Sequence, residues 1–261
     1  GWHDGDLGIT LGGNAQSDLP IFDNTIEGDS NPEHLADRLE GGDGNDLIMS
    51  LGGKDVVGGK NGKDRIEGGG DKDILHGGEG DDILLGGTDS DIILGEKDDD
   101  RLYAETEYTL DDAYTLGKTQ IGSGEKGDLL DGYSGNDTLI GEAGDDILMG
   151  GRGKDVLVSL GGNDTIEGDA NVADSDHDWG VTRSINAEGD LYTKNYKFLI
   201  NDLGDDVGDD DVIYSGTGKD WISAQGGNDF IDAGADDDAV WGDAGNDTLL
   251  GQSGNDVLNG D

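Results

Sequence analysis

The sequence predicts an all-β fold: a parallel β-roll, in which short strands and tight turns coil into a right-handed, β-helix-like solenoid that inserted loops interrupt. Three observations predict it. Glycine and aspartate recur with a period of nine residues, apolar residues recur with the same period, and 51 of the 261 residues are glycine while two are proline. A fixed short period over most of a chain is typical of a solenoid, because each repeat buries its apolar face only against its neighbours.

The repeat is defined by the segment Gly41-Gly42-Asp43-Gly44-Asn45-Asp46-Leu47-Ile48-Met49, whose residues are numbered here as positions 1 to 9. Nineteen repeats keep this register, and all of them have Asp at position 6 and Leu, Ile or Val at position 8. Because positions 6 and 8 keep these residue types in all 19 repeats, they define the register of the repeats.

Positions 7 to 9 are expected to form a three-residue strand whose alternating side chains place position 8 in the core and positions 7 and 9 outside. Positions 1 to 6 are expected to form the turn. Position 4 is Gly in twelve repeats and Asp in five, and these residues tolerate a left-handed backbone best. Two repeats then close one coil of about 18 residues, and successive coils stack as parallel strands.

The repeats divide the chain into six segments. An N-terminal flank with one degenerate repeat precedes a block of eight repeats, and two insertions separate this block from blocks of five and six repeats. The boundaries are 1–31 for the flank, 32–103, 123–167 and 206–261 for the blocks, and 104–122 and 168–205 for the insertions. The chain is expected to be part of a longer protein.

The insertions are expected to replace turns and spare strands, as loops on a rigid scaffold do. The segment 168–205 contains four aromatic residues, Trp179, Tyr192, Tyr196 and Phe198. A structural cap and a partner-binding loop are both compatible with this composition.

Composition indicates that such a chain needs a cation in order to fold. The formal net charge is −45 and only 32% of the residues are hydrophobic, and this combination is typical of disordered chains. The negative charge disfavours nucleic acid as a partner. Cysteine is absent, which excludes disulfides and thiolate metal sites, and no run of about 18 apolar residues predicts a membrane span.

The aspartates predict calcium sites. Stacking places the Asp of one turn beside the turn two repeats along, and carboxylates with backbone carbonyls are the oxygen ligands that Ca²⁺ prefers. Zinc or copper would require clustered His or Cys, and the four histidines are scattered. The expected ligands are the position-6 residues Asp46, Asp55, Asp64, Asp73, Asp82, Asp91, Asp100, Asp128, Asp137, Asp146, Asp155, Asp164, Asp211, Asp220, Asp229, Asp238, Asp247 and Asp256.

The expected number of calcium ions follows from the stacking. If each ion needs two turns that lie two repeats apart, separate blocks hold about 13 ions and a continuous stack holds about 17. Leu35 and Lys126 replace Gly or Asp at position 4 of the first repeat in two blocks. These repeats are expected to be end caps with weak or absent sites.

Motifs of catalysis are missing, so an enzyme is not expected. The sequence has no H-E-x-x-H, no G-x-S-x-G and no cysteine nucleophile. His177 with Asp174, Asp176 and Asp178 is interpreted as a solvated acidic loop rather than as a catalytic or metal cluster.

Repeats that match the motif G-G-x-G-x-D-x-U-x in full include Gly77-Gly78-Glu79-Gly80-Asp81-Asp82-Ile83-Leu84-Leu85 and Gly150-Gly151-Arg152-Gly153-Lys154-Asp155-Val156-Leu157-Val158. The chain therefore resembles the RTX, or hemolysin-type, calcium-binding proteins. The resemblance implies type I secretion from a Gram-negative bacterium and folding outside the cell, where calcium is millimolar. The family includes toxins, proteases, lipases, epimerases and adhesins.

The expected function is that of a non-catalytic, calcium-rigidified segment of a secreted protein, such as an extension arm of an adhesin. Two alternatives remain open. The chain could be the calcium-triggered carrier region of a toxin or hydrolase, or a subunit of a surface layer or filament.

Apolar residues at the outward positions 7 and 9 predict faces that are covered, either by the insertions or by a neighbouring roll. The alternative is that β-propensity alone selects them. They are Leu47, Met49, Val56, Ile74, Ile83, Leu85, Ile92, Leu94, Ile140, Val156, Val158, Trp221 and Trp241.

Overall fold

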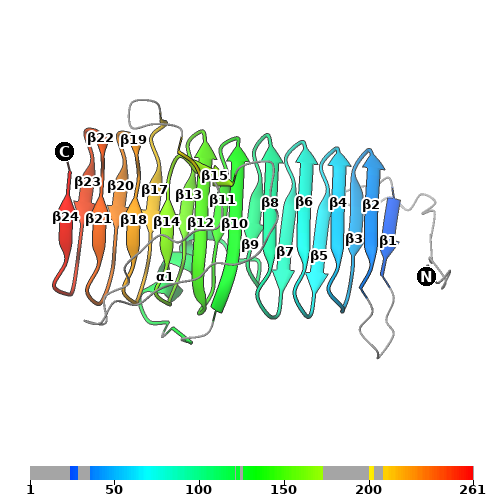
Figure 1. The fold of residues 1–261 in the computed structure, drawn as a ribbon, viewed down its shortest axis with the longest axis horizontal. Helices are drawn as coiled ribbons and strands as arrows, with labels where there is room; N and C mark the ends of the chain where they lie inside the picture. Colours follow the sequence, from blue (N-terminus) through cyan, green and yellow to red (C-terminus); the bar gives the residue numbers. More distant parts are fainter. Residues whose placement is uncertain are drawn as a thin grey trace.

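Two parallel ten-stranded sheets lie face to face and form an elongated roll (Figure 1). The computed structural model describes residues 24–28, 36–120, 122–123, 126–172, 200–202 and 208–260. Each coil contributes one strand to each sheet, so the spatial order of the strands follows the chain. This architecture confirms the predicted all-β parallel solenoid.

The first sheet contains, in spatial order, β1 (Asn24–Glu27), β3 (Asp46–Met49), β5 (Arg65–Gly69), β7 (Ile83–Gly87), β9 (Arg101–Tyr103), β11 (Thr138–Ile140), β13 (Val156–Val158), β17 (Val212–Tyr214), β20 (Phe230–Asp232) and β23 (Thr248–Leu250). The second sheet contains β2 (Arg38–Asp43), β4 (Val56–Asn61), β6 (Ile74–Glu79), β8 (Ile92–Lys97), β10 (Lys126–Ser134), β12 (Asp145–Arg152), β14 (Thr165–Glu167), β18 (Trp221–Ser223), β21 (Ala239–Trp241) and β24 (Val257–Asn259). Two small pairs lie outside them: antiparallel β15 (Ala170–Val172) with β16 (Ile200–Asp202), and parallel β19 (Gly226–Gly227) with β22 (Ala244–Gly245).

The stack continues through both insertions. Leu130 of β10 pairs with Ile93 of β8, although the segment 104–122 separates these strands in sequence. Leu157 of β13 pairs in the same way with Ile213 of β17, across the second insertion. Equivalent repeat positions therefore face one another along the whole roll, which is the arrangement for which about 17 ions were expected.

The core is built from position 8 of each repeat. Ile48, Leu102, Leu157 and Val240 have no exposed surface, and the same holds for almost every position-8 side chain between them. In the last coil Leu258 is 45% exposed, because no described strand lies beyond β24. The core is thus one side chain deep from each sheet, and the turns must supply the remaining stability.

Several strands are longer than the predicted three residues. In the second sheet, β2, β4, β6 and β8 continue from positions 7 to 9 into turn positions 1 to 3. Gly42, for example, pairs with Lys60 of the next coil. The prediction was wrong at these turns because equivalent turn residues of successive coils also lie in register and continue the ladder.

Both corners of the turn need a left-handed backbone. At position 4 the φ angles of Gly44 and Asp71 are 104° and 69°, which confirms the prediction for this position. Position 2 is left-handed as well, at non-glycine residues such as Leu51 (φ 75°) and Lys60 (φ 90°). The sequence did not indicate this second corner, because varied residue types occupy it.

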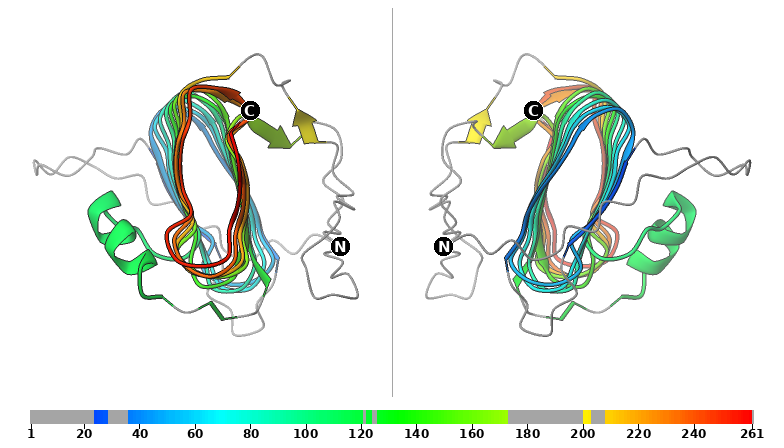
Figure 2. Two further views of the ribbon diagram at one scale, coloured as in Figure 1. Left: turned by 90° about the vertical axis from the view of Figure 1, so that its left-hand side faces the viewer. Right: turned by 90° about the vertical axis from the view of Figure 1, so that its right-hand side faces the viewer.

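The insertion 104–122 contains the helix α1 (Leu110–Gly117), which begins where the Thr109 side chain accepts a hydrogen bond from the backbone N–H of Asp112. Figure 2 shows α1 against one side of the roll. Its Ala113 is fully buried and belongs to a cluster with Tyr103, Ile140, Val158 and Leu160. The helix therefore covers the outer face of the first sheet, which confirms the predicted covering for Ile140 and Val158, each 1% exposed.

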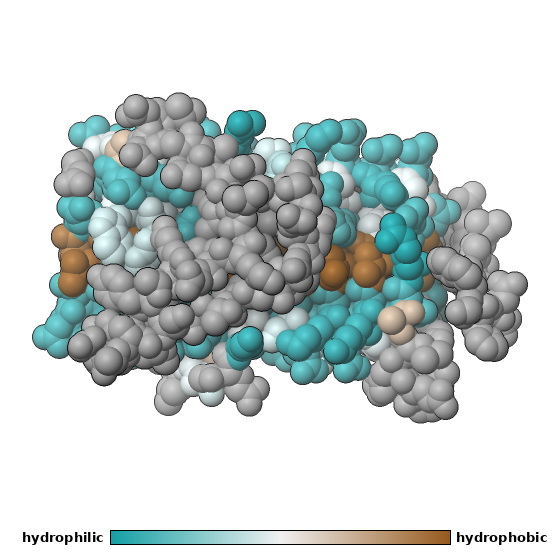
Figure 3. All heavy atoms as spheres, in the orientation of Figure 1, coloured by the Kyte–Doolittle hydropathy of each residue, from teal (hydrophilic) through white to brown (hydrophobic). Residues whose placement is uncertain are grey.

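Ile92 is buried as well, but the other outward apolar residues are only half-buried. On the second sheet these include Val56, Ile74 and Leu94, and Figure 3 shows a hydrophobic band over β4 and β6 between hydrophilic rims. For this band, covering by a neighbour stays a prediction. The aromatic residues Trp179, Tyr192, Tyr196 and Phe198, and the acidic loop around His177, lie outside the described residues.

The turn geometry predicts the effect of one methyl group at two glycines. Gly62, at position 4, has a φ of 138°, and a β-carbon there would lie far inside van der Waals contact with the carbonyl oxygen of Gly44. Gly62→Ala should lower the free energy of unfolding in saturating calcium by about 1–3 kcal/mol, measured by urea titration. Gly58, in β4, has open space around an added β-carbon, so Gly58→Ala should change stability by less than about 1 kcal/mol. Equal losses in the two variants would contradict the assigned turn geometry.

Candidate metal centre

The position-6 aspartates form a continuous hydrogen-bonded ladder between coils. The backbone N–H of one Asp donates to Oδ1 of the position-6 Asp in the next coil, as from Asp46 to Asp64 at 2.7 Å. The bond from Asp155 to Asp211, at 2.9 Å, crosses the second insertion. In the described part of the chain, seventeen such bonds join the aspartates of successive coils.

The structure places every predicted ligand in this ladder, in two rows. The aspartates alternate between the two edges of the roll, because successive turns lead from one sheet to the other. The first edge, formed by turns from the second sheet to the first, carries Asp46, Asp64, Asp82, Asp100, Asp137, Asp155, Asp211, Asp229 and Asp247. The second edge, formed by turns from the first sheet to the second, carries Asp55, Asp73, Asp91, Asp128, Asp146, Asp164, Asp220, Asp238 and Asp256.

The second carboxylate oxygen, Oδ2, is buried and accepts no hydrogen bond in most of these residues. This holds for Asp64, Asp73, Asp82, Asp91, Asp100, Asp137, Asp155, Asp211, Asp229, Asp238 and Asp247. A buried carboxylate oxygen without a donor is costly. Asp146 differs, because its Oδ2 accepts the backbone N–H of Glu142 at 2.9 Å.

Glycine at position 1 leaves the space beside Oδ2 open. A β-carbon on Gly41 would lie 2.6 Å from Oδ2 of Asp46 and 2.8 Å from the carbonyl oxygen of Gly59 in the next coil. At Gly77 the corresponding distances, to Asp82 and Gly95, are 2.5 and 2.7 Å. The carboxylate of one coil and the carbonyl of the next therefore border one small, oxygen-rich space.

Burial makes ionised carboxylates unfavourable in the metal-free roll. It raises the pKa of Asp64 to about 6, of Asp82 to about 8 and of Asp100 to about 9. Hydrogen bonds from the backbone act in the opposite direction but do not offset the desolvation. These oxygens consequently require either a proton or a cation at neutral pH.

The donor set fits calcium. In the part of the chain that the structure describes, no three His, Asp or Glu side chains gather closely enough to hold a metal by themselves. A site must therefore combine Asp carboxylates with backbone carbonyls, which are hard oxygen ligands. A bound calcium ion would neutralise the carboxylates and hold adjacent coils together.

A second ladder, at position 5, was not predicted. Its oxygen-bearing side chains accept the backbone N–H of position 5 in the next coil, as Asn45 does from Lys63 and Asp210 does from Asn228, both at 2.9 Å. Position 5 is exposed or half-buried, and Lys154 lowers the pKa of Asp210 to about 2. The sequence feature that could have predicted this ladder is the frequent Asn at position 5, directly before the Asp of position 6. Its role becomes clear only when position 5 of one coil is compared with position 5 of the next.

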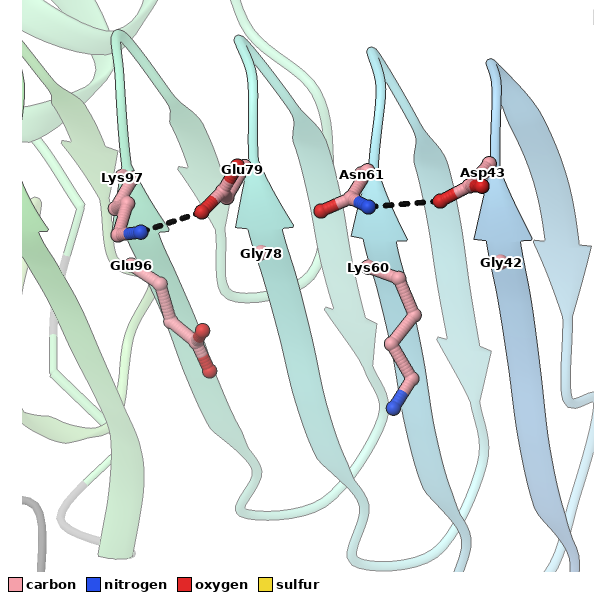
Figure 4. A pocket seen from close by; sticks show the side chains of 8 residues that line it. All are labelled: Gly42, Asp43, Lys60, Asn61, Gly78, Glu79, Glu96 and Lys97. Carbon is pink, nitrogen blue, oxygen red and sulfur yellow. Dashed lines mark hydrogen bonds and ion pairs between the residues drawn. The ribbon is translucent and has the colours of Figure 1, made fainter.

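The outer side of the turns carries paired charges and no buried carboxylate row. A shallow groove of about 380 Å³ crosses positions 2 and 3 of four coils (Figure 4). Within it Lys97 donates to Glu79 at 2.5 Å, and Asn61 donates to Asp43 at 2.7 Å. Exposed ion pairs of this kind contribute little stability, and unlike the position-6 carboxylates these side chains are exposed and have hydrogen-bond partners.

Asp169 is a further residue that sequence reasoning missed. It lies where the second insertion leaves a turn, and its Oδ1 and Oδ2 accept the backbone N–H groups of Asp209 and Gly226 at 3.2 and 3.0 Å. Burial raises its pKa to about 6. Asp169 thus ties the two ends of the interrupted turn together.

No helix in the described part of the chain is long and apolar enough to cross a membrane.

Comparison with known proteins agrees with this geometry. The family model of the RTX calcium-binding nonapeptide repeat, which spans four copies, matches residues 36–66, 58–93, 76–106, 123–157, 149–171, 205–240 and 234–261. No curated protein matches the chain. The matched segments make up more than half of the sequence and contain all eighteen aspartates of the two rows. The chain belongs to the RTX calcium-binding nonapeptide-repeat family, and its β-roll binds multiple calcium ions.

Proposed function

We propose that this chain is a non-catalytic structural segment of a secreted protein, unfolded without calcium and rigid with it. The observation that carries the proposal is the continuous ladder of position-6 carboxylates, in most of which a buried Oδ2 atom accepts no hydrogen bond, as in Asp64, Asp82 and Asp155. In this proposal the eighteen aspartates of the two rows are the calcium ligands, together with backbone carbonyls. About 17 ions would reduce the formal charge from −45 to about −11.

Calcium would act in place of a large hydrophobic core. The core has one apolar side chain per strand, and this burial offsets only part of the conformational entropy lost on folding. Without cations, buried carboxylates repel one another and lose hydration. The balance therefore favours the unfolded chain when calcium is scarce and the roll when calcium reaches the range that extracellular modules bind, about 0.1–1 mM.

RTX repeats are typical of secreted proteins, which supports the proposals of type I secretion and of a Gram-negative cell surface. The elongated shape of the roll (Figure 1) supports an extension arm, as in an adhesin. The half-buried band with Val56, Ile74 and Leu94 favours a second candidate, in which neighbouring rolls pack laterally as in a surface layer. The carrier region of a toxin or hydrolase would use the same calcium switch.

Calcium-dependent folding is the direct consequence. In chelator the chain should give a disordered circular dichroism spectrum and an expanded radius in small-angle scattering. Calcium at about 1 mM should produce a cooperative gain of strand signal together with compaction. A strand spectrum of the same strength in chelator would refute the proposal.

Matched variants test the aspartate rows in that titration. Asp155→Ala removes a buried carboxylate from the middle of the ladder and should raise the calcium midpoint several-fold. Asp37→Ala, in the first repeat of the first block, should raise it much less. Equal midpoints for the two variants would contradict the assigned register.

The raised pKa values predict an effect of pH in chelator. A carboxyl group whose folded pKa lies above its unfolded value stabilises the fold while it is protonated, and this stabilisation is lost as pH rises through the folded pKa. Since several position-6 values lie between about 6 and about 9, strand signal in chelator should be higher near pH 5 than near pH 9. Strand signal that rises with pH in chelator would contradict the burial of these carboxyls.

A further inference from the structure

The two edges of the roll differ at position 1, the residue that borders the space beside Oδ2. On the first edge position 1 is glycine in every uninterrupted turn but one, where it is Ala224. In the turn that the second insertion interrupts, Gly168 lies beside the carboxylate of Asp211.

On the second edge the uninterrupted turns have glycine except at Ala233 and at three serines, Ser50, Ser159 and Ser215. All three serines have no exposed surface. Ser123, at position 1 of the repeat that follows the first insertion, is exposed.

Each serine hydroxyl donates a hydrogen bond to the position-1 carbonyl of the next coil. In the glycine turns, the equivalent carbonyl borders the space beside the carboxylate. Ser50 donates to the position-1 carbonyl of Gly68 in the next coil at 2.8 Å. Ser159 donates to the carbonyl of Ser215 at 2.8 Å, and Ser215 donates to the carbonyl of Ala233 at 2.6 Å. At Gly68, the glycine turn that follows Ser50 on the same edge, a β-carbon would lie 2.5 Å from the equivalent carbonyl and 2.7 Å from Oδ2 of Asp73. In the serine turns, a β-carbon and a hydroxyl fill the corresponding space.

We propose that these three turns are closed by a serine hydroxyl in place of a calcium ion. The inference rests on the proposed function, in which calcium lies between Oδ2 and the turn carbonyls. Calcium then forms an unbroken row along the first edge and an interrupted row along the second, and the number of ions expected for the continuous stack falls from about 17 to about 14. The protein itself supplies the link between coils at the interruptions, through the buried serine hydroxyls. Those of Ser159 and Ser215 also hydrogen-bond to the carboxylates of Asp164 and Asp220 in their own turns.

Two of the three serine turns lie where the first insertion contacts the roll. Ser159 and Ser215 lie in consecutive coils, next to the buried Leu160 against which α1 packs. The hydroxyl of Thr217, in the same turn as Ser215, donates to the carbonyl of Gln120 at the end of the first insertion. The insertion therefore contacts the roll where the link between coils does not depend on metal.

The opposite assignment is that the serine oxygen is itself a calcium ligand. The two assignments predict opposite changes when the hydroxyl and the β-carbon are removed. If serine replaces an ion, glycine should create a site. If serine binds an ion, glycine should weaken one.

The test is the number of calcium ions bound by the full chain, counted by native mass spectrometry at saturating calcium. The variant Ser50→Gly/Ser159→Gly/Ser215→Gly should bind up to three more ions than the native chain, and Ser159→Gly alone should bind one more. Both variants place at position 1 the residue that most other turns already have, so the stacked fold is retained.

Ser90→Gly is the matched control. Ser90 lies on the same edge and its hydroxyl also donates to a carbonyl of the next coil, that of Lys126 at 2.9 Å, but it occupies position 5. The ion count of this variant should equal the native count. An unchanged or lower count in the triple variant would overturn the inference, whereas a native chain that binds no calcium would refute the proposed function itself.

Discussion

The fold depends on one interaction: a buried carboxylate held between two coils. Along the ladder, Oδ1 of a position-6 aspartate accepts the backbone N–H of the equivalent aspartate one coil earlier, and Oδ2 lies near a carbonyl of the coil that follows. This arrangement aligns the coils but in most of these aspartates leaves a buried oxygen that accepts no hydrogen bond. The roll therefore acquires its register from hydrogen bonds and its stability from whatever cation neutralises that oxygen.

The other features of the repeat follow from this constraint. Position 1 is small because a β-carbon would enter the space beside Oδ2. Positions 2 and 4 take left-handed backbones, because six residues must reverse the chain and bring the carboxylate back over the preceding coil. Position 8 only needs to fill a thin core. Side chains outside the turn and on the sheet faces are free to vary, and there the chain carries its insertions, its ion pairs and its apolar band.

Sequence reasoning predicted what is periodic and missed what depends on adjacent coils. The register, the buried position 8 and the left-handed position 4 follow from residue types that recur every nine residues. The bonds of position 5, the left-handed residues at position 2 and the serine hydroxyls involve pairs of residues one coil apart, often of varied type, so no single repeat reveals them. Helix α1 was missed because its contacts are with Ile140 and Val158, which lie far from it in sequence. Whether the blocks act as separate domains stays a prediction.

Anomalous scattering from crystals grown in calcium would test the central claim most directly. The account predicts roughly 13 to 17 calcium ions, arranged in two rows between consecutive coils, each within coordination distance of an Oδ2 atom of a position-6 aspartate. Fewer than about eight ions, or ions bound mainly to the exposed carboxylates of positions 3 and 5, would contradict it.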